Sequence, residues 1–372
     1  MKLVLSTLLC VLFAGPAIGQ QSPQDLIVRA NQGTVGVITG MEGGTYARTA
    51  ADLTILDDDN LRVLPVLGKG SLQNLSDILY LKGIDIGFVQ ADALTYAKLH
   101  NLFPNLTQGI RYIAKLYNEE IHVLARKDIA QLKDLNGQRI NVDVTGSGSA
   151  MTAEILLSEL GINAKIENQK QVTGVQELEH GDIAAIIHVG GAPIPLLADI
   201  PADSGIHFLP VAIDQALLSQ TYLPAEFTHQ TYPQLVPAGT SVPTIAVGDV
   251  MAVYAWPPRT ERYAKVARFV DAFFSRFDEF LKPPRHPKWR EVNLAAQVPG
   301  WTRFSAAQDW LDQHAAAAAA NANMQGDFNK FIAVRLTNGG EITPEQREAL
   351  FKEFLQWRDQ QSALNKGQTS TP

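Results

Sequence analysis

Residues 139–161 read RINVDVTGSGSAMTAEILLSELG, and the fold prediction starts from them. The first six letters alternate apolar and polar residues, which predicts a half-buried strand, and residues 152–160 carry apolar side chains at helical spacing. Between them lies TGSGS, whose glycines allow a sharp turn and whose hydroxyls can cap the first helical amides. The free amides of such a helix start can bind an anion. The alternative is that this sequence forms only a tight turn from strand to helix and binds no anion.

A second loop of this kind lies near the start of the chain. Residues 36–48, GVITGMEGGTYAR, again predict a strand, a glycine turn and a helix start. One helix terminus contributes about 0.3 to 1 kcal/mol to holding a charge, whereas micromolar binding needs about 8 kcal/mol. We therefore expect two lobes that present both turns to one ligand.

Two more predicted strands end in polar residues. Leu61 to Val66 is followed by GKGS, with Ser71 placed to cap a helix through Tyr80, and the strand from Ile84 to Val89 runs into Gln90. Alternating strands and helices predict an α/β fold with parallel strands, and ligands bind beyond the carboxyl ends of such strands. Ser71 and Gln90 are therefore candidate ligand contacts. A helix cap and a strand-end cap are the structural alternatives.

The N-terminus has the features of a secretory signal. Residues 1–19 contain Lys2, an apolar run and small residues at A-x-G spacing, which predicts cleavage before Gln20 and a periplasmic protein. The single charge of this segment leaves a retained N-terminal anchor as the alternative. The apolar run is shorter than the roughly 20 residues of a membrane span.

Composition excludes several function classes. The only cysteine lies in the signal, so the mature chain has no disulfide, thiol nucleophile or thiolate metal site. The whole chain has 31 basic and 38 acidic residues, and loss of Lys2 changes the formal charge from −7 to −8, which argues against nucleic acid as a partner. The motifs G-x-S-x-G, H-E-x-x-H and C-x-x-C and a Walker loop are missing, and the eight histidines lack ligand spacing. We predict a protein that is not an enzyme and that has no metal site and no cofactor.

Four motifs occur in an order that is typical of one family. They are TG-x-x-GGTY at Thr39 to Tyr46, GxGSxxNL at Gly68 to Leu75, GxDxGFVQAD at Gly83 to Asp92, and LxDLxGxRxxVDxxGSGS at Leu132 to Ser149. Residues 31–280 thereby resemble the TAXI-type solute receptors, the extracytoplasmic binding subunits of TRAP transporters.

The resemblance implies a fold and a function. The fold is a two-lobed type II periplasmic-binding-protein fold of class α/β, with the ligand cleft between the lobes and hinge closure as its motion. The implied ligand is a small organic anion, such as glutamate, a related amino acid or a dicarboxylate like 2-oxoglutarate, which the receptor delivers to the TRAP membrane permease. We expect a monomer. The rival function is a periplasmic ligand sensor that signals through a membrane partner, for which an additional C-terminal segment would serve.

The predicted ligand contacts combine the resemblance with the strand ends. Where the family carries a second aromatic residue after Tyr46, this chain has Ala47 and Arg48, so Arg48 is a further candidate cation. Arg111 lies in a predicted strand pair, RYIAKLY and EIHVLA, and is another; for both arginines solvent exposure is the alternative. The full set of predicted contacts is Gly44, Thr45, Tyr46, Ser71, Gln90, Thr145, Gly146, Ser147, Gly148, Ser149 and Gly191.

The expected organisation has six parts. The last of the predicted helices begins with a capping box at Thr343 and Gln346, and it packs on the first lobe or forms a partner surface. In chain order, the six parts are the signal peptide (1–19), the first part of lobe 1 (20–126), lobe 2 (127–229), the second part of lobe 1 (230–281), a helical C-terminal extension (282–360) and a disordered tail (361–372).

Overall fold

The computed structural model describes residues 22–58, 60–211, 222–316, 350 and 354. It divides the chain into two compact units, Met1–Phe304 and Ser305–Pro372. In the second unit, described residues 305–316 are helical. The predicted signal peptide, most of the last predicted helix and the predicted tail lie outside the described residues. Within the described ranges, no helix combines the length and the apolar character that crossing a membrane requires.

Lobe 1 is built around β1, which lies between β2 and β3 and is parallel to both. Its elements follow the predicted alternation of strand and helix. They are α1 (Pro23–Gln32), β1 (Thr34–Ile38), α2 (Thr45–Asp52), η1 (Leu53–Leu56), β2 (Arg62–Val66), α3 (Ser71–Tyr80), β3 (Ile86–Gln90), α4 (Asp92–Leu99), α5 (Leu106–Gly109), α10 (Glu261–Ser275), η3 (Phe277–Glu279) and η4 (Pro287–Glu291).

Lobe 2 repeats this plan around β5, which is parallel to β6 and β7. The strand expected from Ile140 to Val144 ends earlier, because Asp143 has a positive φ of 76° that breaks the extended backbone. The elements of the lobe are η2 (Leu132–Leu135), β5 (Arg139–Asn141), α6 (Gly148–Glu159), β6 (Lys165–Glu167), α7 (Gln171–His180), β7 (Ala185–Gly190), α8 (Pro195–Ala198), β8 (Ile206–Phe208) and β9 (Tyr222–Thr228).

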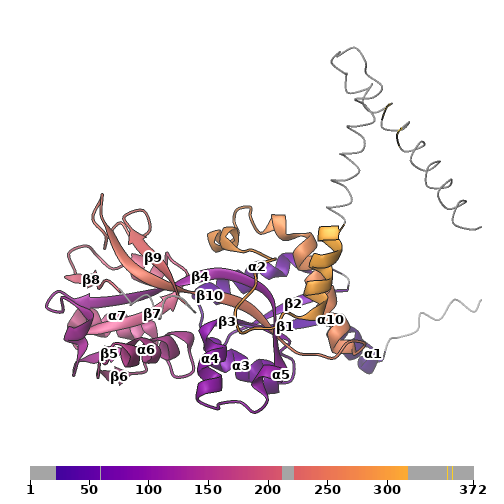
Figure 1. The fold of residues 1–372 in the computed structure, drawn as a ribbon, viewed down its shortest axis with the longest axis horizontal. Helices are drawn as coiled ribbons and strands as arrows, with labels where there is room; N and C mark the ends of the chain where they lie inside the picture. The colour runs from indigo at the N-terminus through magenta and orange to yellow at the C-terminus, as the bar shows by residue number, and fades with distance from the viewer. Residues whose placement is uncertain (1–21, 59, 212–221, 317–349, 351–353, 355–372) are drawn as a thin grey trace, which may run out of the picture. The chain divides into compact units, whose positions relative to one another are not determined.

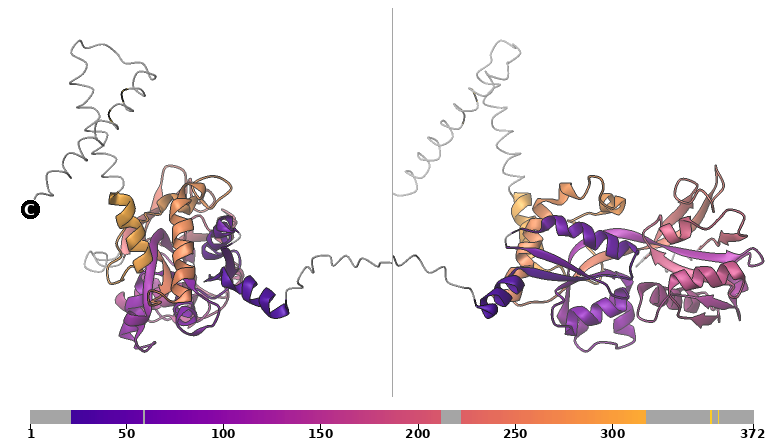
Figure 2. Two further views of the ribbon diagram at one scale, coloured as in Figure 1. Left: turned by 90° about the vertical axis from the view of Figure 1, so that its right-hand side faces the viewer. Right: turned by 180° about the vertical axis from the view of Figure 1, so that it is seen from behind.

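Two long strands connect the lobes. Strands β4 (Ile110–Arg126) and β10 (Ser241–Tyr254) are antiparallel neighbours and run from one lobe to the other, as Figures 1 and 2 show from opposite sides. The sequence predicts two strands in the segment 110–126, and this is wrong: the segment is a single strand of 17 residues. Its polar middle, Asn118 to Glu120, resembles a turn but lies where the chain passes between the lobes.

The strand order explains how each lobe is completed. The main path is β2-β1-β3-β10-β4-β7-β5-β6, so β10 enters lobe 1 next to β3, and β4 enters lobe 2 next to β7, each antiparallel to its neighbour. Along this path each lobe has three parallel strands and one inserted antiparallel strand, and lobe 2 adds β8, antiparallel to β4, and β9, antiparallel to β10. The predicted two-lobed type II periplasmic-binding-protein fold is confirmed.

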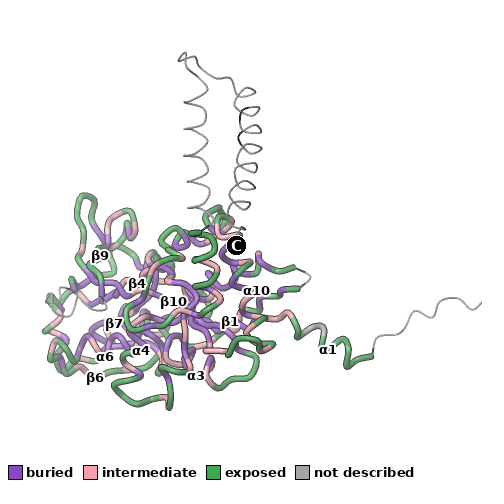
Figure 3. Tube along the Cα trace, turned by 45° about the vertical axis from the view of Figure 1, so that its right-hand side comes forward, coloured by how far each residue is buried: buried purple, intermediate pink, exposed green. Residues whose placement is uncertain are grey.

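The buried residues follow the sheet, as the purple parts of the tube in Figure 3 show. One apolar cluster in lobe 1 includes Met151 of α6, so lobe 2 contributes a core residue to lobe 1. A cluster in lobe 2 includes Tyr232 and Val236, so the core of this lobe reaches past residue 229.

The segment after η4 runs along β4. Lys115 forms a bridge with Asn293, and Tyr112 forms one with Arg303. These residues belong to the first compact unit, which ends at Phe304, although the sequence assigns residues 282–304 to the C-terminal extension.

Candidate functional site

Three helices from both lobes begin around one small pocket. The pocket has a volume of about 80 Å³, and its walls include the first residues of α2, α3 and α6, namely Thr45, Ser71 and Gly148. The residues that precede α2 and α3 are glycines, and neither helix has a side-chain cap. Because the first amides of a helix have no partner within it, α2 and α3 present uncapped amides beside the pocket.

The serine hydroxyls of the pocket are used within the protein. The sequence predicts that Ser71 caps α3, but Gly70 is the N-cap, and the Ser71 hydroxyl accepts a 3.0 Å bond from the Gln90 amide. Ser147 is the N-cap of α6 and accepts from the Ala150 amide at 3.0 Å, which confirms a hydroxyl cap in this turn. The Ser149 hydroxyl accepts from the amide of Val189, also at 3.0 Å. The serines therefore shape the pocket, and the amides of the turns are the donors that remain for an anion.

The two lobes meet directly at these turns. The Gln73 amide of α3 donates to the Gly146 carbonyl at 3.1 Å, and the Thr45 hydroxyl donates to the Gly191 carbonyl at 3.4 Å. A Cβ atom on Gly148 would lie 1.6 Å from Oε1 of Gln90. Side chains of lobe 1 would have to shift to admit a Cβ atom at position 148, so the two lobes are in close contact and the structure is a closed arrangement.

Most of the predicted contacts come together at the pocket. Gly146 and Gly191 take part in the contact between the lobes, Thr145 is exposed, and none of the three lines the pocket. Those that line it are Gly44, Thr45, Tyr46, Ser71, Gln90, Ser147, Gly148 and Ser149. Contact of these residues with a ligand stays a prediction.

The two candidate arginines lie elsewhere. Arg48 is exposed on α2. Arg111 donates to backbone carbonyls of α5 and of β4, including those of Thr107 and Ile110. Neither guanidinium lines the pocket.

Two buried acids lie beside Tyr46 on the crossing strands, and Glu119, but not Asp249, lines the pocket. The Tyr46 hydroxyl is 3.0 Å from Oε2 of Glu119 on β4 and 2.7 Å from Oδ1 of Asp249 on β10. Burial raises the pKa of both carboxyls well above the usual range, and the negative charge of Asp249 raises the pKa of Glu119 further. Since a tyrosine hydroxyl has one proton, it can donate to only one of them, and the second contact needs a proton on a carboxyl. The cluster therefore holds one shared proton and one negative charge.

A third acid, Asp143, lies on the opposite side of the cleft. It lines the pocket, is 7% exposed and accepts from the amide of Val144 at 2.8 Å through its own Oδ1. Burial raises the pKa of Asp143 to about 6. Burial also lowers the pKa of nearby His188 to about 4, so this pocket-lining imidazole is neutral at pH 7.

The pocket opens into a wider chamber. This outer chamber has a volume of about 760 Å³ and shares with the pocket residues such as Met41, Asp143 and Ile194. Apolar side chains of both lobes form much of its wall, namely Met41, Leu67, Val172, Ile194, Pro195 and Leu196.

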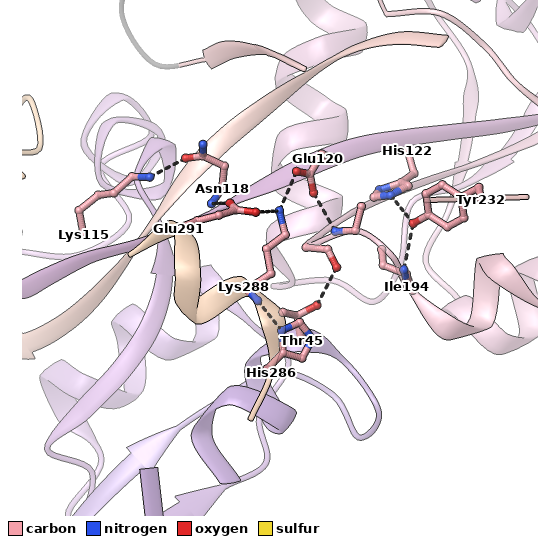
Figure 4. A network of polar contacts seen from close by, with 12 residues as sticks. Thr45, Lys115, Asn118, Glu120, His122, Ile194, Tyr232, His286, Lys288 and Glu291 are labelled. Carbon is pink, nitrogen blue, oxygen red and sulfur yellow. Dashed lines mark hydrogen bonds and ion pairs between the residues drawn. The ribbon is translucent and has the colours of Figure 1, made fainter. Parts of the chain in front are cut away.

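A polar network ties the crossing strands to the rim of the cleft (Figure 4). Lys288 of η4 forms 2.8 Å ion pairs with Glu120 of β4 and with Glu291. The other oxygen of Glu120 accepts from the Ala192 amide at 2.7 Å, next to Gly191. Lys288 is thus neutralised by two carboxylates, and Glu120, unlike Glu119, has a cationic partner.

Sequence reasoning missed Glu119, Asp143 and Asp249. The polar run Asn118 to Glu120 inside an apolar segment was the available signal for Glu119, although it also fits a turn. Among the residues that the structure describes, no group of three His, Cys, Asp or Glu side chains is arranged to hold a metal ion.

Comparison with known proteins places the chain in a family. Residues 37–287 match the model of the NMT1-like family. The chain belongs to this family. The match includes both lobes, both crossing strands and the start of η4.

Solved structures resemble the chain at low sequence identity. The periplasmic binding protein BugD shares 13% identity, with a TM-score of 0.45 over 79% of this chain and 97% of that chain. Tv2483 bound to L-arginine shares 12%, with a TM-score of 0.42 over 75% and 100%. A substrate-binding protein of an ABC uptake transporter from Streptococcus pneumoniae, with bound histidine, shares 14%, with a TM-score of 0.41 over 68% and 91%.

Proposed function

We propose that this protein is the extracytoplasmic solute-binding subunit of a TRAP transporter. It captures a small organic anion, a glutamate-like amino acid or a dicarboxylate, and delivers it to the membrane permease. It works as a periplasmic monomer and catalyses no reaction. The observation that carries the proposal is the meeting of three helix starts from two lobes at one pocket. Free amides on both sides of a cleft suit a carboxylate, and ligand bound there favours the closed arrangement.

A ligand screen tests this proposal. The purified chain, stripped of ligand by unfolding and refolding, is heated with amino acids, dicarboxylates and 2-oxo acids, and with sugars as neutral controls. A ligand at one hundred times its Kd stabilises the folded state by about 2.7 kcal/mol, which a thermal shift detects. We expect stabilisation by one class of small carboxylate. Stabilisation by sugars alone, or turnover of the bound compound, would contradict the proposal.

A periplasmic ligand sensor is the second candidate function. It is favoured by the separate compact unit Ser305–Pro372, which follows the binding lobes. Deleting residues 305–372 distinguishes the two functions in cells. A transport receptor keeps solute uptake, whereas a sensor keeps solute binding and loses its signalling output.

A further inference from the structure

The charges of the pocket do not balance in the absence of a ligand. Glu119 and Asp143 line it and are 3% and 7% exposed. Within the described ranges, neither carboxylate forms an ion pair with a lysine, arginine or histidine. Lys69, which is exposed, is the one described cation in the pocket wall, because His188 is neutral. Buried carboxylates are normally paired with a cation, so this wall is suited to a positive group on the ligand.

The backbone at Asp143 supports a ligand role. Its φ of 76° is unusual for a residue other than glycine and is a strained backbone conformation. Asn168 donates to the Asp143 carbonyl at 2.8 Å and helps to hold this conformation. A strained, buried carboxylate that faces a pocket and has no ion-pair partner among the described residues is typical of a binding residue.

The outer chamber indicates the other end of the ligand. It is much larger than the inner pocket, and its apolar wall includes Leu67 and Val172, which are 60% and 56% exposed. An apolar group of the ligand would remove both side chains from contact with water, which lowers the free energy. Lys69 and Lys170 also line the chamber, but both are exposed to water, and a glutamate side chain would place a carboxylate among the apolar residues.

We propose that the solute is an amino acid with an apolar side chain. Its ammonium group faces Glu119 and Asp143, its carboxylate takes the free amides at the helix starts, and its side chain enters the outer chamber. This inference rests on the proposed function and narrows it. Among the organic anions considered there, it selects zwitterions and disfavours dicarboxylates and 2-oxo acids, which have no cationic nitrogen.

Matched pairs of compounds test the ammonium group. Isothermal titration calorimetry on the full chain compares leucine with 4-methyl-2-oxopentanoate, and glutamate with 2-oxoglutarate. Each pair differs only in an amino group against a keto group. We expect leucine to bind at least tenfold more tightly than its oxo acid. Equal or tighter binding of the oxo acids would overturn the inference and leave the proposed function standing, whereas failure of every compound in the wider screen would overturn both.

A homologous series tests the outer chamber. From alanine through 2-aminobutyrate and norvaline to norleucine, each buried methylene is expected to tighten binding about fourfold. Affinity that stays flat or falls along this series would overturn the assignment of the chamber to an apolar side chain.

A charge-removing variant tests the residue assignment. Glu119→Gln keeps the shape of the side chain, and we expect it to weaken leucine binding at least tenfold while the affinity for the oxo acid stays the same or rises. Glu226→Gln removes one exposed carboxylate from β9 and is the matched control, with no change expected. If Glu119→Gln weakened both compounds equally, Glu119 would have a structural role only, and its assignment would be wrong.

Discussion

Two buried acids in lobe 1 have opposite surroundings. The side chain of Asp85 is fully buried, accepts from the Gly36 amide at 3.0 Å, and lies 2.7 Å from Nζ of Lys265 on α10. Glu119 is as deeply buried, yet its neighbours are a tyrosine and the second acid Asp249. The first acid holds a helix against the sheet. The second shares one proton and one negative charge with Asp249 beside the pocket, where we propose that the ammonium group of the ligand lies. The two acids therefore differ in whether the protein supplies a cation.

The largest effect is expected at the paired acid. Asp85→Asn leaves Lys265 without its partner, and breaking a buried ion pair in this way costs about 3 to 5 kcal/mol. Urea denaturation should show the loss as a lower midpoint with an unchanged slope. Glu119→Gln is the comparison: it removes repulsion from Asp249, and we expect its stability to equal or exceed that of the wild type. If both variants lost the same stability, the distinction between the two acids would fail.

The pH dependence of stability at Asp143 extends the comparison between paired and unpaired buried acids. Burial raises its pKa from 3.8 to about 6, so the folded state favours the protonated form. The stability that this group contributes is complete below about pH 4 and is lost as the pH rises towards 6. Asp143→Asn removes this loss, so its stability relative to the wild type should increase between pH 4 and 6, by at most about 3 kcal/mol.

Denaturation midpoints of both proteins at several pH values provide the measurement. His188, whose pKa is lowered to about 4, destabilises both proteins as the pH falls from 6.5 towards 4, so its effect cancels in the difference. A difference that is independent of pH would show that Asp143 is not a buried, uncompensated acid.

The closed contact of the lobes can be broken without touching a charge. A methyl group at Gly148 would overlap Gln90, so we expect Gly148→Ala to weaken solute binding at least tenfold, about 1.4 kcal/mol, while the protein still folds. Gly40→Ala is the control, because its methyl group would lie at an ordinary 3.5 Å from the Tyr46 ring. Unchanged affinity in Gly148→Ala would mean that binding does not need this closed contact.

The smallest effect is expected at Arg111. Its guanidinium binds backbone carbonyls of α5 and of β4 and does not line the pocket. Arg111→Ala should change solute affinity less than twofold in the same calorimetric assay. A tenfold loss would mean that this cation compensates the pocket acids over a distance.

Much of the fold could be predicted because its signals are local. Short apolar runs predicted β2 and β3, and the glycine turns predicted the starts of α2 and α6. The glycine turns also allowed Tyr46 and Gly148 to be predicted as pocket residues, because glycine just before a helix can be recognised in the sequence.

The missed parts depend on contacts that are distant in sequence. Glu119 meets Asp249 only because β4 and β10 are neighbours, and 130 positions separate these acids along the chain. The αL backbone of Asp143 is equally hidden, because the letters around it alternate as those of a regular strand. Ser71 was misread as a cap because its true partner, Gln90, belongs to the next strand.

The exchange of strands between the lobes has a consequence for folding. Residues 127–229 without β4 would lack the strand that pairs with β7, and residues 22–109 without β10 would leave the edge of β3 unpaired. Neither fragment has a complete sheet, so the lobes cannot fold one after the other as independent domains. Formation of the sheet requires pairing between distant segments, which favours slow folding and a single cooperative unfolding transition for both lobes.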